Sequence, residues 1–97
     1  MSPQTEILAE IRKHTSELKA YGVKKVGIFG SFVHSGQHAK SDIDILVDFG
    51  RGHKTFDNYM GLKFYLERLF HRKVDLVIKD ALKPRIKGQV LSEVKYA

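Results

Sequence analysis

The sequence has no cysteine and no tryptophan, only two prolines, and no long apolar run. The absence of cysteine excludes disulfide bonds and thiolate metal sites, so secretion gains no support from a disulfide framework. No apolar stretch approaches the ~20 residues that a membrane-spanning helix needs. Residues 1–6 also lack a signal-peptide pattern. These absences predict a soluble cytoplasmic protein with no membrane contact.

The charge balance is basic. Seventeen Lys and Arg residues against eleven Asp and Glu give a net charge of +6, and 42% of the 97 residues are hydrophobic. This length predicts a single domain over residues 1–97 with a modest core. A basic surface favours nucleotides, nucleic acid or an acidic partner, although solubility explains it equally well. The basic residues form no long run, and the few aromatic residues are not interleaved with them as in a base-stacking surface. This pattern disfavours nucleic-acid binding.

Hydrophobic periodicity and turn residues predict alternating helices and strands. The predicted elements are a helix at 3–21 capped by Ser2, a strand at 23–29, a helical turn at 32–35, a strand at 41–49, a helix at 55–71 capped by Thr55, a strand at 74–78, a helix after Pro84 and a strand-like tail at 94–96. Core candidates on the helix at 55–71 are Phe56, Tyr59, Met60, Leu66 and Phe70. The order indicates an α/β (α+β) fold, a small mixed β-sheet with helices packed on one face.

Three aspartates lie in or beside the predicted strands, where aspartate is depleted. Asp42 and Asp44 are two residues apart, so on a strand they project to one face with Cα atoms roughly 6.5–7 Å apart. Asp75 alternates with apolar neighbours in a later strand. If the two strands are neighbours, all three carboxylates can converge on the face away from the core. Asp48 shares the parity of Asp44 but lies ~13 Å further along, which excludes it from the same site.

These residues together suit phosphoryl or nucleotidyl transfer. Carboxylates held this close repel each other unless a hard divalent cation lies between them. Gly30 and Ser31 follow a strand, where backbone N–H groups and a hydroxyl can hold a phosphate chain. Asp75 can accept the proton of an attacking hydroxyl. Each part alone has a plainer interpretation, a turn for the glycine–serine pair and a solvated strand edge for the aspartates, and only the combination favours catalysis.

Other polar residues near these motifs are weaker candidates. His34 and His38 are four residues apart and could bind metal on a helix, but no third ligand is evident and we interpret them as loop residues. Lys40, Arg51 and Lys54 flank the predicted site in sequence and could reach phosphates. Solvated loop charges explain the same three residues equally well.

The spacing from Gly30-Ser31 over ten residues to Asp42-x-Asp44, with Asp75 in a later strand, resembles the DNA polymerase β-type nucleotidyltransferase superfamily. The short chain and the segment Ser-Asp-Ile-Asp-Ile-Leu-Val resemble its minimal nucleotidyltransferases, the MNT or MntA-like antitoxins. The resemblance implies that Gly30 and Ser31 contact the triphosphate of ATP or another NTP. It also implies that Asp42, Asp44 and Asp75 bind Mg²⁺ and form the catalytic triad.

The resemblance further implies a partner. Minimal nucleotidyltransferases are paired with HEPN-domain RNase toxins, and some transfer AMP from ATP to a toxin tyrosine. No second domain for acceptor recognition is evident in this chain, so a partner would have to be the acceptor or supply it. Two alternatives stay open: a catalytically weak module that neutralises a HEPN partner by occlusion, and a basic nucleic-acid-binding protein with steeply salt-dependent affinity.

The glycine–serine loop departs from the family pattern. Related loops often read Gly-Ser-x-Ala-Arg-Gly, whereas residues 30–36 read Gly-Ser-Phe-Val-His-Ser-Gly. His34 stands where arginine is usual, and Gly36 comes one residue late. The change removes a fixed positive charge near the phosphates. It therefore bears on turnover and nucleotide choice more than on fold or metal binding.

Overall fold

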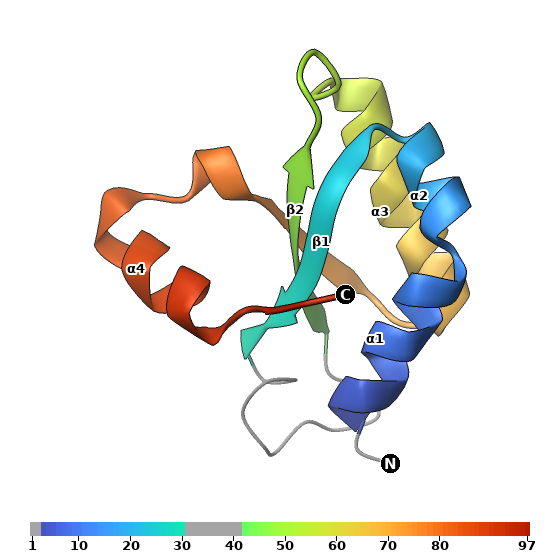
Figure 1. The fold of residues 1–97 in the computed structure, drawn as a ribbon, viewed down its shortest axis with the longest axis horizontal. Coiled ribbons are helices and arrows are strands. Elements are labelled where there is room, and N and C mark those ends of the chain that lie inside the picture. The colour runs from blue at the N-terminus through green and yellow to red at the C-terminus, as the bar shows by residue number, and fades with distance from the viewer. Residues whose placement is uncertain (1–2, 31–41) are drawn as a thin grey trace.

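The computed structural model describes residues 3–30 and 42–97 (Figure 1). Its elements are α1 Pro3–Lys13, α2 Thr15–Ala20, β1 Val23–Phe29, β2 Ile43–Phe49, α3 Phe56–Phe70, β3 Val74–Ile78, the short 3-10 helix η2 Lys79–Ala81, α4 Pro84–Glu93 and β4 Lys95–Tyr96. The predicted element types are therefore confirmed wherever the structure describes them. The proposed cap at Ser2 and the helical turn at 32–35 lie outside the described residues.

The first predicted helix is divided in two, which is a correction to the continuous helix expected over 3–21. His14 leaves helical geometry (φ −112°, ψ 27°), and its N–H donates to the Ile11 carbonyl in a tighter turn. The Thr15 hydroxyl donates to the Arg12 carbonyl at 2.7 Å and so competes with the helical ladder. Ile11 and Leu18 nevertheless both lie buried in the core, so the break preserves the apolar face.

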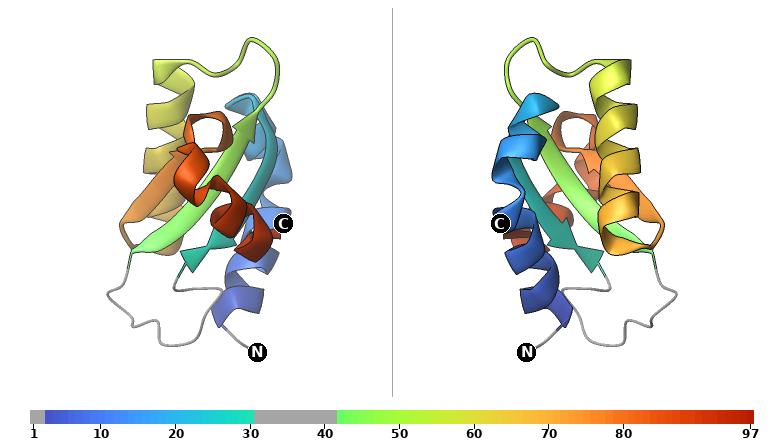
Figure 2. Two further views of the ribbon diagram at one scale, coloured as in Figure 1. Left: turned by 90° about the vertical axis from the view of Figure 1, so that its left-hand side faces the viewer. Right: turned by 90° about the vertical axis from the view of Figure 1, so that its right-hand side faces the viewer.

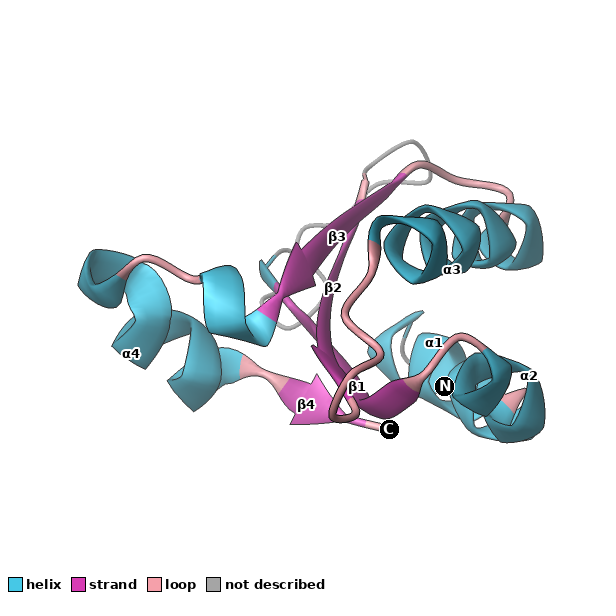
Figure 3. Cartoon of the chain, turned by 90° about the horizontal axis from the view of Figure 1, so that it is seen from above, coloured by secondary structure: helices cyan, strands magenta, loops and turns pink. Residues whose placement is uncertain are grey.

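The four strands form one mixed sheet in the order β3-β2-β1-β4. β1 pairs antiparallel with both β2 and β4, whereas β2 and β3 are parallel. Parallel neighbours need a crossover connection, and α3 supplies it. In Figure 3, α1, α2 and α3 cover one face of the sheet, while α4 lies on the other side. The predicted fold class is confirmed, and α4 adds partial cover on the second face.

The main core lies between the sheet and helices α1 to α3. Ile43, Ile45 and Val47 alternate along β2 and are completely buried there. α3 contributes Leu62 and Leu66 to this core, and both side chains are 0% exposed. Leu62 was not among the residues expected in the core.

One predicted core residue is wrong. Phe56 is 77% exposed, whereas Leu62 is completely buried and marks the side of α3 that faces the core. At about 100° per residue, Phe56 lies roughly 120° around the helix from Leu62 and therefore points away from the core. Tyr59 is only ~60° from Leu62 on the same reckoning, and it packs against the core. Phe70 also packs there and Met60 is half-buried, so the other expected core residues of α3 are at least partly covered.

Hydrogen bonds at its two ends hold α3 in place. The Thr55 hydroxyl accepts from the Asn58 N–H at 3.1 Å, which confirms the predicted N-cap. Near the other end, the Glu67 carboxylate accepts from the Val74 N–H at 3.0 Å and from the Lys63 ammonium at 3.2 Å. The second end of α3 is thereby tied to the first residue of β3.

None of the helices within the described ranges has the length and apolar character required to cross a bilayer.

The second face of the sheet carries a smaller buried patch. Leu46 points away from the main core yet is only 1% exposed. Its register partner Gly27 lies so close to the chain after α4 that an added Cβ would come 2.9 Å from Val94 Cγ2 and 2.7 Å from the Lys95 carbonyl oxygen. A side chain at Gly27 would therefore displace the end of α4. This contact fixes α4 on the face opposite helices α1 to α3.

Candidate active site

The register between β2 and β3 places two of the predicted carboxylates side by side. Asp44 and Asp75 are paired residues on these parallel strands, whose separation is about 4.8 Å. Val74 and Leu76 are buried in the core, whereas Asp75 between them is exposed. Paired residues of neighbouring strands project to the same face, so both aspartates lie on the face away from the main core. Their position on that face agrees with the alternation expected from the sequence.

The predicted phosphate-loop glycine lies against this carboxylate pair. Phe29 is the register partner of Asp44, and Gly30 follows it with a left-handed φ of 68°. A Cβ at Gly30 would collide with the Asp44 carboxylate oxygen Oδ2. Glycine is therefore needed here both for the backbone angle and for the close approach. Residues from β1, β2 and β3 meet at this point of the sheet.

The remaining predicted residues are less constrained. Asp42 is exposed and precedes the first ladder residue of β2, so strand pairing does not set its direction. Ser31, His34, His38 and Lys40 lie outside the described residues. Across 3–30 and 42–97, no group of three or more His, Asp or Glu side chains is placed to hold a metal ion. Convergence of all three aspartates stays a prediction.

The paired carboxylates have the donor chemistry of a site for a hard cation. Two aspartates in register repel each other, and carboxylate oxygens are the donors that Mg²⁺ prefers. Gly30 leaves backbone close to Asp44 without an intervening side chain. The donor chemistry of the two aspartates is thus compatible with Mg²⁺.

A family model of the nucleotidyltransferase domain matches residues 8–97. The chain belongs to this nucleotidyltransferase family. It is 41% identical over 92 residues to the protein adenylyltransferase MntA of Thermococcus cleftensis, an alignment covering 94% of this chain and 92% of that protein. The predicted membership and the enzyme class are therefore confirmed.

Solved structures agree with the family. A protein assigned as a minimal nucleotidyltransferase superposes with a TM-score of 0.81 at 33% identity, covering 98% of this chain and 95% of that one. The MNT antitoxin in complex with tri-AMPylated Shewanella oneidensis HEPN toxin superposes with a TM-score of 0.65 at 21% identity, covering 93% and 70%. The second likeness shows a shared fold alone.

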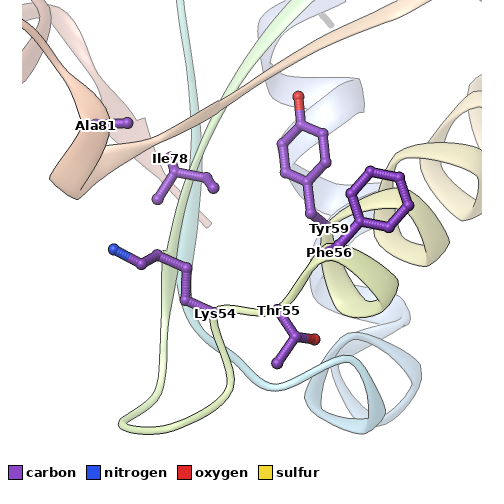
Figure 4. A pocket seen from close by; sticks show the side chains of 6 residues that line it. All are labelled: Lys54, Thr55, Phe56, Tyr59, Ile78 and Ala81. Carbon is purple, nitrogen blue, oxygen red and sulfur yellow. The ribbon is translucent and has the colours of Figure 1, made fainter.

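A separate cavity lies at the other end of this nucleotidyltransferase. It has a volume of about 340 Å³ and is mostly apolar, and Figure 4 shows the residues that line it: Lys54, Thr55, Phe56, Tyr59, Ile78 and Ala81. Ile78 ends β3, ~10 Å beyond Asp75 by strand rise. The cavity is thus distinct from the carboxylate site.

The strand direction favours one of the two interpretations of Arg51 and Lys54. These residues could reach the phosphates or be solvated loop charges. They come after the far end of β2, ~17 Å along the strand from Asp44, and Lys54 lines the separate cavity. An extended strand carries the chain away from the site faster than sequence proximity suggests.

Proposed function

We propose that this nucleotidyltransferase transfers AMP from ATP to a tyrosine of a HEPN-type toxin and so acts as its antitoxin. The observation that supports this most is the pairing of Asp44 with Asp75 directly beside Gly30. The name of the Thermococcus relative and the AMPylated toxin in the Shewanella complex support the choice of AMP and of a protein acceptor.

The chemistry is an in-line displacement at the α-phosphorus. The tyrosine oxygen forms a bond to this phosphorus as the bond to the pyrophosphate oxygen breaks, and pyrophosphate leaves. In this proposal Asp75 accepts the proton of the tyrosine hydroxyl, which its exposure and its position next to Asp44 support. Gly30 allows the phosphates to approach the backbone, and we assign Ser31 to the same phosphates from its place in the sequence.

Mg²⁺ completes the proposal. Asp42, Asp44 and Asp75 would hold it, and it would neutralise charge on the phosphates during the transfer. Asp44 is half-buried, and it lies on the face of β2 opposite the two buried isoleucines that flank it in sequence. The more exposed Asp75 keeps the freedom to act on the acceptor as well.

The decisive experiment compares Asp44→Asn with Asp48→Asn. Asp48 lies on the same strand and has the same parity, but its register partner is Lys25 rather than a residue of β3. We expect Asp44→Asn to lower the rate of AMP transfer from labelled ATP to a HEPN-domain protein at least ~100-fold, because a ligand and charge are lost at the reacting phosphate. Asp48→Asn should retain the wild-type rate. Equal losses in both variants would contradict the assignment.

Neutralisation by occlusion is the second candidate, favoured by the altered sequence of residues 30–36. The same two variants separate the two functions. An Asp44→Asn protein that still suppresses the RNase activity of the toxin would act by binding. One that binds the toxin but no longer suppresses it would act by AMP transfer.

A further inference from the structure

The segment that runs from η2 into the first part of α4 is strongly basic. Residues 79–89, here called the basic arm, contain Lys79, Lys83, Arg85 and Lys87 against the single acid Asp80. Four cations minus one anion give +3, half of the chain's net charge of +6. Among the residues that the structure describes, no carboxylate pairs with any of these four cations. The charge of the arm is therefore not compensated within the described fold.

The basic arm lies on the same side of the sheet as the paired aspartates. Gly27 faces Val94, which directly follows α4, and its register partner Leu46 shares the parity of Asp44 on β2. Figure 2, on the left, shows α4 in front of this face of the sheet. The basic arm and the paired aspartates therefore share one face of the sheet.

The arm is also loosely held. Residues 83–89 are all exposed, and Val90 is the only buried residue of α4. Ile86 is 45% exposed in the middle of the cationic stretch. A side chain at Gly88 would point into open space, so no other described element packs on that position. Such a surface leaves both charge and apolar area available to a partner.

We propose that the basic arm recognises an acidic surface beside the acceptor hydroxyl on the partner protein. This inference rests on the proposed function, in which the acceptor is a protein. Cations without internal partners attract an anionic surface and speed its encounter with the site. Exposed Ile86 adds a place for apolar contact at the centre of the arm.

A protein fits the arm better than a nucleic acid does. Residues 79–93 contain no aromatic or histidine side chain on which a base could stack. A protein surface can instead place carboxylates against the arm and a neutral hydroxyl against the aspartates.

The test compares two triple variants of identical composition. The arm variant removes three charges from the basic arm by Lys83→Gln/Arg85→Gln/Lys87→Gln. The control variant removes three charges from α1 and α2, on the opposite face of the sheet, by Arg12→Gln/Lys13→Gln/Lys19→Gln. With a HEPN-domain protein from the same organism as acceptor, the arm variant should raise the acceptor KM about tenfold, since each exposed ion pair contributes a modest increment. The kcat and the KM for ATP should not change. The control variant should match wild type in all three.

Salt and direct binding supply the second measurement. The Kd of the wild-type complex, measured without ATP, should weaken steeply with added salt, and the arm variant should show a flatter dependence. An unchanged acceptor KM and Kd in the arm variant, or an equal change in the control variant, would overturn the inference. So would a raised KM for ATP, or loss of RNA binding without any effect on the toxin. If wild type binds the toxin but transfers no AMP, the proposed function fails, and the Kd alone decides the role of the arm.

Discussion

At the scale of single residues, the candidate site depends on two unusual positions. Gly30 has a left-handed backbone and leaves no room for a side chain beside Asp44. Asp75 is an exposed charge on a five-residue strand whose neighbours are buried. Neither feature contributes to the core, and both agree with the proposed site, in which backbone and carboxylates would meet one phosphate chain.

Glu67 makes the clearest single-residue contribution to stability. The N–H of Val74 donates a hydrogen bond to the Glu67 carboxylate. This bond, and after it the Lys63 ammonium, holds the pKa of Glu67 below its ordinary value of 4.5. A carboxyl whose pKa is lower in the folded state stabilises the protein above its unfolded pKa. That stability is lost as the pH falls through the folded value.

Glu67→Gln should therefore lower the free energy of unfolding at pH 7 by about 1–2 kcal/mol, because a charged acceptor is replaced by a neutral one. The difference from wild type should shrink as the pH falls below 4.5. Urea denaturation of both proteins at pH 7 and near pH 3 measures the loss of unfolding free energy and its decrease at low pH. Glu17→Gln, at an exposed residue of α2, serves as the control and should stay within about 0.5 kcal/mol. A pH-independent difference would contradict the role of the charge.

At the scale of elements, α3 separates buried from exposed apolar residues sharply. Leu62→Ala should cost about 2–5 kcal/mol of unfolding free energy, because the side chain is completely buried and its removal leaves a cavity. Phe56→Ala should change it by no more than about 0.5 kcal/mol, since the ring is 77% exposed. Denaturant titration of both variants gives the comparison. Similar losses would mean that Phe56 packs in solution.

The type of each element could be predicted from the sequence, because helix and strand periodicities are local. β1, β3 and the N-cap of α3 at Thr55 follow from apolar alternation and capping chemistry. The break at His14 could not be predicted, since it depends on the Thr15 hydroxyl reaching the Arg12 carbonyl. The exposure of Phe56 could not be predicted either, because the sequence at the start of a helix does not show which side of the helix will face the sheet.

At the scale of the whole molecule, the two faces of the sheet differ in how firmly they are covered. The face toward α1, α2 and α3 carries the main core, whereas α4 contributes only Val90 as a buried residue. Segments with few buried contacts open at lower free energy than the core does. The stability of the molecule is therefore expected to be uneven.

Hydrogen exchange tests this expectation. Amides of residues 86–89 in α4 should exchange at least ~100-fold faster than those of residues 44–48 in β2, because local opening of α4 exposes little apolar area. Exchange measured by NMR on the free chain gives both rates. Addition of the HEPN partner should slow exchange in α4. Equal protection of the two segments in the free chain would show that α4 is part of the main cooperative unit.

The sequence by itself determined the element types, the family and the face on which Asp44 and Asp75 lie, because each depends on spacing along the chain. Only the tertiary structure decided that β2 and β3 are parallel neighbours in a register that pairs these aspartates. It also decided that Gly30 abuts Asp44, that Lys54 lies at the far end, and that α4 shares the carboxylate face. Strand order and helix placement arise from contacts between distant segments, which local periodicity does not encode.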